Sequence, residues 1–151
     1  MLKGIPTEIS SELLKALADM GHGDILVIAD DFYPPYSKTP NGRSINAKGN
    51  TAPEMLDAIL KLFPLDTEYE AYPVEYMIPD ADANINLSQR PKVWDDCIRV
   101  CEKHGLTKEQ VGEIERSKFY EKAGRAFVTV CTSEREAYGC FIIHKLSLIH
   151  I

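Results

Sequence analysis

The stretch Met20-Gly21-His22-Gly23-Asp24-Ile25-Leu26-Val27-Ile28-Ala29-Asp30 decides how the centre of the chain folds. Glycines on both sides of one histidine mark the end of a helix, where they allow unusual backbone angles or the close approach of a ligand. The apolar run from Ile25 to Ala29 predicts a buried strand. His22 and Asp30 therefore lie at the two ends of one structural unit, and this pair of side chains suits proton-transfer chemistry.

Helical and strand-like patterns alternate on both sides of this unit. Apolar spacing and capping residues predict three helices: one capped by Ser10 or Ser11 and ending at Gly21, one between Thr51 and Pro64, and one from Pro91 to near Gly105. Further strands are predicted at 73–78, 125–131 and 140–144. The sequence therefore predicts an α/β fold, a single three-layer domain with a mostly parallel sheet and helices on both faces.

Three other segments carry weaker signals. Residues 31–42 contain three prolines and an Asn-Gly pair, which predicts a loop without regular structure, and residues 79–89 are polar and turn-prone. Residues 107–118 fit two patterns, because Thr107 and Gln110 can cap a helix while 111–116 also alternates as a strand does. Local signals favour the helix there.

Composition restricts the class of protein. The 151 residues suit one domain, and 17 Lys and Arg against 23 Asp and Glu give a formal net charge of −6. Because no basic run interrupts this acidic balance, we expect no nucleic-acid partner. The chain shows no signal-peptide core and no apolar segment of bilayer length, so we also expect no membrane association and a cytoplasmic location.

The four cysteines allow two interpretations. Cys97, Cys101 and His104 follow one another at helical spacing, whereas Cys131 and Cys140 lie in predicted strands. The chain has no tight Cys-x-x-Cys pair of the kind that binds zinc. We therefore interpret the cysteines as reduced, buried thiols, and keep a thiol or metal protein as a weaker alternative.

Dispersed motifs carry a resemblance to a known family. They are Met1-Leu-Lys-Gly-Ile5, Ser11-Glu-Leu-Leu-Lys15, Met20–Asp24, Ile28-Ala-Asp30, Leu62-Phe-Pro-Leu-Asp66, Phe119-Tyr-Glu-Lys-Ala123 and Tyr138-Gly139. In this order, from residue 1 to about 145, the chain resembles the L-fucose mutarotase branch of the ribose pyranase and fucose mutarotase family. Several motifs in a fixed order make the resemblance specific.

The resemblance implies an isomerase that interconverts the α and β anomers of a reducing monosaccharide, without a metal or an organic cofactor. It implies that His22 is the acid/base residue. The residues that it implies for sugar binding are Asp30, Arg116, Tyr120, Tyr138, Gly139 and Cys140. A carboxylate and a guanidinium suit this task, because each can hold two hydrogen bonds in a defined plane.

The resemblance also changes a local interpretation and marks two differences. It implies a strand over 111–116 and a short helix over 117–123. Cys140 replaces the family's usual asparagine, which removes an amide that donates and accepts strong hydrogen bonds. The loop Asp31-Phe32-Tyr33-Pro34 lacks a histidine that relatives often carry. Both differences bear on sugar preference, and Tyr33, Tyr36 and Tyr138 fit either stacking on a sugar or anchoring of loops.

Assembly and the chain end are two further expectations. The resemblance implies a ring-like homo-oligomer whose pockets are completed by a neighbouring subunit, which needs two different complementary patches on each subunit. The chain divides into a fucose mutarotase-like domain over 1–145 and a tail over 146–151. The tail, Leu146-Ser-Leu-Ile-His-Ile151, reads like the translation of a transposon end, and we expect it to be non-native.

Two other functions fit parts of the pattern. A non-catalytic monosaccharide-binding module of the same fold keeps Asp30 and Arg116 but loses turnover through Cys140. A D-ribose pyranase-type isomerase shares the fold and acts on a different sugar, although Gly23 favours the fucose branch. Measuring anomer exchange with several sugars separates these functions.

Overall fold

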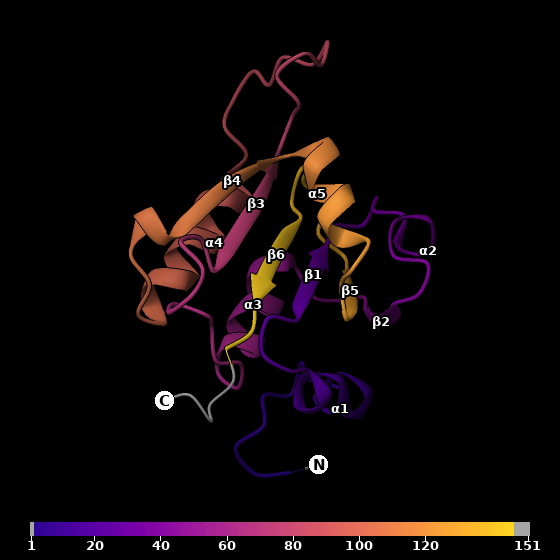
Figure 1. Cartoon of the computed structure of the whole chain (residues 1–151), viewed down its shortest axis with the longest axis vertical. Coiled ribbons are helices and arrows are strands. Elements are labelled where there is room, and N and C mark those ends of the chain that lie inside the picture. Colours follow the sequence, from indigo (N-terminus) through magenta and orange to yellow (C-terminus); the bar gives the residue numbers. More distant parts are fainter. Residues whose placement is uncertain (1, 147–151) are drawn as a thin grey trace.

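A six-stranded sheet forms the centre of the computed structural model, which describes residues 2–146 (Figure 1). The strands are β1 (Ile25–Ala29), β2 (Arg43–Ala47), β3 (Val74–Ile78), β4 (Val111–Glu115), β5 (Val128–Thr132) and β6 (Phe141–His144). Their order across the sheet is β2-β5-β1-β6-β3-β4. Neighbouring strands run parallel except for β6, which is antiparallel to β1 and β3. The predicted mostly parallel sheet is confirmed.

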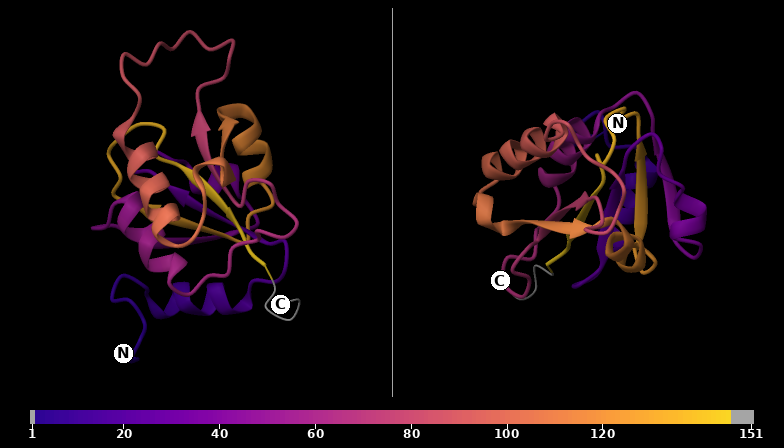
Figure 2. Two further views of the ribbon diagram at one scale, coloured as in Figure 1. Left: turned by 90° about the vertical axis from the view of Figure 1, so that its left-hand side faces the viewer. Right: turned by 90° about the horizontal axis from the view of Figure 1, so that it is seen from above.

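Helices cover both faces of this sheet (Figure 2). They are α1 (Ser11–Asp19), α2 (Pro35–Lys38), α3 (Ala52–Leu60), α4 (Lys92–Lys103) and α5 (Arg116–Ala123), with a single 3-10 turn at Lys108–Gln110. Apolar side chains of α1, α3 and α4 build the larger core on one face, and those of α5 build a smaller core on the other. This arrangement confirms the predicted three-layer α/β fold.

Capping residues start the two predicted amino-terminal helices where the sequence places them. The Ser10 hydroxyl accepts the backbone N–H of Leu13 at 3.1 Å, which satisfies a free donor at the start of α1. Thr51 does the same for Glu54 at 3.4 Å at the start of α3. Both helices are therefore confirmed, although α3 ends at Leu60, before Pro64.

Two expectations for the region after β1 need correction. Residues 31–42 are not wholly irregular, because α2 begins at Pro35, whose fixed φ angle suits the first position of a helix. The strand β2 was not predicted at all. Only Ile45 and Ala47 of β2 are buried, and the strand lies at the edge of the sheet, so its apolar signal is short.

The structure resolves the ambiguity at residues 107–123. Thr107 and Gln110 do form a capping box, but it starts only the single 3-10 turn. β4 follows it at Val111–Glu115, as the family resemblance implies. Arg116 is the first residue of α5 and not the last residue of the strand.

The described part of the chain ends just inside the predicted tail. Leu146 is 4% exposed, and its backbone N–H donates to the Pro64 carbonyl at 2.9 Å, so this residue packs with the domain. Residues 147–151 of the predicted tail lie outside the described residues. Within residues 2–146, every helix is too short or too polar to cross a membrane.

Candidate active site

The structure separates the predicted site residues into two groups at opposite ends of β1. Asp30 follows β1 at the carboxyl edge of the sheet, whereas His22 precedes the strand at the amino edge. A strand of five residues is about 16 Å long. His22 and Asp30 therefore lie at the two ends of one unit, as the sequence predicts, and do not meet within one chain.

A cavity of about 210 Å³ opens at the carboxyl edge. It is lined by the predicted residues Asp30, Arg116, Tyr120, Tyr138 and Cys140, together with Phe32, Tyr33, Met77 and Ala137. They come together because the carboxyl ends of the parallel strands β1, β3 and β4 and the amino end of the antiparallel β6 share one edge. Topology thus gathers side chains from distant parts of the sequence, and we call this space the Asp30 cavity.

Arg116 and Tyr120 reach the Asp30 cavity from neighbouring turns of α5. The guanidinium carbon of Arg116 lies 4.8 Å from the centre of the Tyr120 ring, in a cation–π contact. Asp80 holds the start of the helix, because its carboxylate accepts the backbone N–H of Ser117 at 3.0 Å and the Ser117 hydroxyl at 2.8 Å. The two side chains therefore come from an anchored helix.

A buried ionic cluster holds the other end of α5. Lys122 forms an ion pair with Glu75 of β3, and Glu75 Oε1 lies 2.9 Å from His144 Nε2 of β6. Glu75 and His144 are 9% and 1% exposed. Burial alone raises the pKa of Glu75, but the hydrogen bonds from His144 and Lys122 outweigh it and lower this pKa overall. The cluster fixes α5 to the sheet.

Asp30 is the buried carboxylate of the Asp30 cavity. Its Oδ1 accepts the backbone N–H of Phe32 at 3.1 Å, and the residue is 7% exposed. Burial raises the pKa of Asp30, and the Phe32 N–H offsets part of that rise. In a small cavity this carboxyl can accept hydrogen bonds from ligand hydroxyls with little competition from water.

The Cys140 thiol lies in the wall beside Asp30. Its Sγ accepts the backbone N–H of Asp30 at 3.4 Å, and only 2% of the residue is exposed. Burial raises the pKa of this thiol well above its usual value, and the Asp30 carboxylate adds to the rise. The protonated thiol thus supports the backbone of Asp30 and presents little surface to a ligand.

The loop before β6 places Tyr138 beside the cavity. Tyr138 has a φ angle of 63°, and its carbonyl accepts the Trp94 indole N–H at 2.8 Å. Gly139 is not in the lining of the cavity, but a Cβ on it would lie 2.8 Å from Glu134 Cγ and 3.0 Å from the Glu136 carbonyl oxygen. The glycine is needed for this close approach of the chain.

Two carboxylates that the sequence did not single out hold the same loop. Glu136 accepts the backbone N–H groups of Lys92 and Val93 at 3.1 and 2.6 Å, at the start of α4. Glu134 accepts the N–H of Ala52 at 3.2 Å, at the start of α3. A carboxylate stabilises a helix amino terminus through its free N–H groups and its dipole. Because these partners lie at least 43 residues away, no local pattern could have predicted the contacts.

Tyr33 and Tyr36, for which the sequence left sugar stacking or loop anchoring open, lie in different surroundings. Tyr33 is 8% exposed, and its ring centre lies 6.2 Å from that of Phe119 and 5.7 Å from that of Tyr120. It therefore anchors the loop and also lines the cavity. Tyr36 is 80% exposed on α2 and is not in that lining.

His22 lies exposed on the turn at the amino edge. Gly23 has a φ angle of 82°, which confirms that the turn needs a glycine there. The His22 ring meets the exposed Tyr69 ring edge-on, with 4.9 Å between ring centres. The imidazole is therefore presented outward at this edge.

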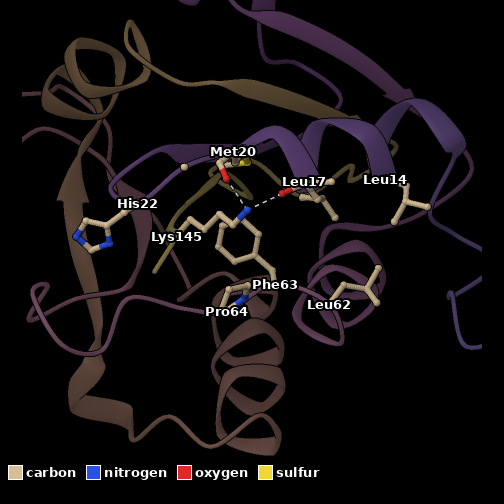
Figure 3. A pocket seen from close by; sticks show the side chains of 10 residues that line it. Leu14, Leu17, Met20, His22, Leu62, Phe63, Pro64 and Lys145 are labelled. Carbon is tan, nitrogen blue, oxygen red and sulfur yellow. Dashed lines mark hydrogen bonds between the residues drawn. The ribbon is translucent and has the colours of Figure 1, made fainter. Parts of the chain in front are cut away.

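A second, mostly apolar cavity of about 330 Å³ adjoins His22, between α1 and residues 62–64 (Figure 3). Lys145 reaches across it, and its Nζ donates to the carbonyl oxygens of Leu17 and Met20 at 2.7 and 2.5 Å. A lysine in this position satisfies free carbonyl groups at the end of α1. Lys145 therefore holds the helix that leads into the His22 turn.

The cysteine pair on α4 belongs to the larger core. Cys97 and Cys101 are both 0% exposed, and burial raises the pKa of Cys101 to about 12. His104 Nε2 lies 2.8 Å from Asp57 Oδ1 of α3. Such protonated, inaccessible thiols favour the interpretation as buried structural cysteines.

Family comparison decides the class of protein. The model of the RbsD / FucU transport protein family matches residues 3–146. The chain belongs to the RbsD / FucU family. Within it, the fucose mutarotase of Danio rerio is 41% identical over 146 residues, which cover 96% of this chain and 93% of that protein. The resemblance expected from the motifs is confirmed.

Two further members of the RbsD / FucU family extend this comparison. The L-fucose mutarotase of Actinobacillus pleuropneumoniae serotype 5b is 37% identical over 145 residues, 96% of either chain. The crystal structure of the fucose mutarotase from Streptococcus pneumoniae in complex with L-fucose has a TM-score of 0.85 and 37% identity, covering 97% of this chain and 99% of that one. Fold and sequence thus point to the same branch.

Proposed function

We propose that this chain is a sugar mutarotase that interconverts the α and β anomers of a reducing monosaccharide similar to L-fucose. The observation that carries the proposal is the Asp30 cavity, whose small space is lined by a carboxylate, a guanidinium and tyrosines. Such groups bind the hydroxyls of a sugar. The structural match to a fucose mutarotase that holds L-fucose supports the same substrate class.

The reaction needs proton transfers and no cofactor in this proposal. A base takes the proton of the anomeric hydroxyl while an acid protonates the ring oxygen, and the bond between the anomeric carbon and the ring oxygen breaks. The open-chain aldehyde rotates and closes with its hydroxyl on the other side. We assign the acid/base role to His22, because imidazole exchanges protons near neutral pH. Asp30 and Arg116 hold the sugar meanwhile.

Assembly completes the proposed site. His22 lies at the amino edge and the Asp30 cavity at the carboxyl edge, so a head-to-tail contact between subunits brings the two together. Repetition of that contact closes a ring-like homo-oligomer. The exposure of both His22 and Tyr69 supports a contact at the amino edge. The four free thiols support a reducing, cytoplasmic location.

Anomer exchange measured by NMR tests the proposal. Addition of the protein to L-fucose should accelerate exchange between the α and β signals, and D-ribose under the same conditions should respond less. Absence of acceleration with every reducing sugar tested would contradict the proposal. Faster exchange of D-ribose than of L-fucose would favour the D-ribose pyranase-type isomerase.

One observation supports a second candidate function. Among the described residues, the lining of the Asp30 cavity contains no histidine. A chain that does not assemble would therefore bind a sugar without supplying the acid/base group, as a non-catalytic monosaccharide-binding module does. Light scattering that finds a monomer at micromolar concentration, together with L-fucose binding and no accelerated exchange, would support this alternative.

A further inference from the structure

Phe32 is an exposed aromatic residue in the wall of a polar cavity. It lines the Asp30 cavity, and 61% of its surface is exposed. The ring contributes to neither hydrophobic core of the described chain. Core packing therefore does not explain a phenyl ring at this place, and a large apolar side chain left in water beside a binding cavity points to a ligand.

Backbone hydrogen bonds fix Phe32 relative to the carboxylate of the site. Its own N–H donates to Asp30 Oδ1 at 3.1 Å. On either side, the N–H of Asp31 donates to the Glu134 carbonyl at 2.8 Å and that of Tyr33 to the Asp30 carbonyl at 3.4 Å. The phenyl ring and the Asp30 carboxyl thus belong to one rigid turn, so a ligand bound to Asp30 lies within reach of the ring.

We propose that Phe32 is a further sugar-contacting residue, whose ring packs on the C–H face of the substrate and selects 6-deoxyhexoses over pentoses. This inference rests on the proposed mutarotase function and names the residue that sets its sugar preference. The sequence marked the loop Asp31-Phe32-Tyr33-Pro34 as a difference that bears on sugar preference, but gave Phe32 itself no role.

The division of chemistry within the cavity fits a pyranose. A pyranose ring carries its hydroxyls around the edge and presents C–H groups on its faces, so it needs polar partners at the edge and an apolar surface on a face. Asp30 and Arg116 supply the polar partners, and Phe32 supplies an apolar surface beside them. The methyl group of a 6-deoxyhexose extends the apolar face, whereas a pentopyranose has no carbon there.

A nearby cation orients the loop without covering the cavity wall. The guanidinium carbon of Arg135 lies 5.7 Å from the centre of the Phe32 ring, and Arg135 Nε lies 3.5 Å from Asp31 Oδ2. Even with this neighbour, Phe32 as a whole residue remains 61% exposed. Surface therefore remains for a substrate to cover.

The test compares three variants with two sugars. Phe32→Ala should raise the KM for L-fucose exchange about tenfold, while the KM for D-ribose changes less than about twofold, because the contact of Phe32 with the methyl group exists only in the hexose. Phe32→Tyr keeps the ring and should behave as the parent does. Tyr36→Ala is the matched control, since it removes an exposed aromatic ring four residues away, outside the cavity.

Two outcomes would overturn the assignment of Phe32. One is an equal change, or no change, in KM for the two sugars. The other is that Phe32→Ala lowers the molar mass in light scattering, which would make the ring a subunit contact and not a sugar contact. If the parent chain accelerates no exchange, the proposed function fails, and titration calorimetry with L-fucose still decides whether Phe32→Ala weakens binding.

Discussion

The two edges of the sheet differ in how firmly a single chain holds the candidate site residues in place. At the carboxyl edge, Asp30 is buried, α5 is anchored at both ends, and two glutamates cap helices to hold the loop of Tyr138. At the amino edge, His22 lies exposed on a turn with a glycine at positive φ. The proposed binding residues are thus preorganised within the chain, whereas the proposed acid/base residue faces outward.

This difference has a physical reason if the carboxyl edge binds the sugar and His22 transfers protons, as proposed. A buried carboxylate needs fixed neighbours, because misplacement leaves it without hydrogen bonds in a medium of low polarity. A histidine that acts in another subunit must project from the surface. The following experiments test this division between the two edges and the parts of the chain that support it.

The largest effect is expected from His22→Ala. If His22 moves the protons, catalysed exchange should fall by about a hundredfold to ten-thousandfold, because that is the usual contribution of a positioned acid/base group. L-fucose binding should persist, since the carboxyl edge is unchanged. His22→Gln should be almost as inactive. The control is His104→Gln, because His104 contacts Asp57 of α3 and lines neither the Asp30 cavity nor the cavity beside His22. Near-parental exchange with bound sugar would make His22 a structural residue.

A mixing experiment tests whether the two edges meet between subunits. His22→Ala and Asp30→Asn should each be inactive alone. When they are unfolded together and reassembled in equal amounts, about a quarter of the contacts should join an intact His22 to an intact Asp30, and about a quarter of the parental activity should return. Mixtures that remain inactive while forming rings of normal size would place each active site within a single subunit.

The ionic cluster of Glu75, His144 and Lys122 predicts how the anchoring of α5 responds to acid. The pKa of Glu75 is lowered in the folded chain, so its stabilising effect is complete above the unfolded value near 4.5 and is lost as pH falls through the folded value. Glu75→Gln should cost about 3 kcal/mol of unfolding free energy at pH 7 and flatten the loss of stability below pH 4.5. Urea unfolding across pH measures both. Parallel pH profiles for parent and variant would contradict the assignment.

A smaller change is expected from Cys140→Asn. The amide oxygen is a stronger acceptor than sulfur for the Asp30 N–H, and the amide restores a group that donates as well. Exchange of L-fucose should be equal to that of the parent or a few-fold faster, by about threefold at most. Cys140→Ala controls for loss of the thiol alone. Severe loss of exchange in the asparagine variant would give the thiol a role of its own.

The smallest effect concerns the chain end. Deletion of 147–151 should leave the melting temperature and the exchange rate unchanged, as expected of a non-native tail. The contrast is Leu146→Ala, which should cost about 2 kcal/mol because Leu146 is 4% exposed. A clear drop in melting temperature on deletion would show that the tail belongs to the domain.

Much of the fold follows from local patterns in the sequence. Ser10 and Thr51 start helices because each hydroxyl accepts the free backbone N–H of the residue three positions later. Such a short spacing can be recognised in the sequence itself. The continuous apolar run of β1 is also a local signal, and it predicts that the strand is buried. Between residues 107 and 118, local signals favoured the wrong element, and the family resemblance corrected them. The apolar pattern of the edge strand β2 is too short to predict a strand.

The site shows the limit of such patterns. The motifs and the resemblance placed Asp30, Arg116, Tyr120, Tyr138 and Cys140 together, and all five line one cavity. Phe32 was missed, because its exposure beside Asp30 depends on a turn held by Glu134, more than a hundred residues along the chain. The same holds for Glu75 and His144, which are 69 residues apart in sequence and in contact through β3 and β6.

By itself, the sequence determined most of the helices and strands, the α/β class and the family, because capping, apolar periodicity and motif order all act over short stretches. Only the tertiary structure decided which of these residues meet. Strand order across the sheet gathers Asp30 and Arg116 at one edge, and the length of β1 sets His22 at the other. Distances between strands depend on how the whole sheet is paired, and no local stretch of sequence carries that information.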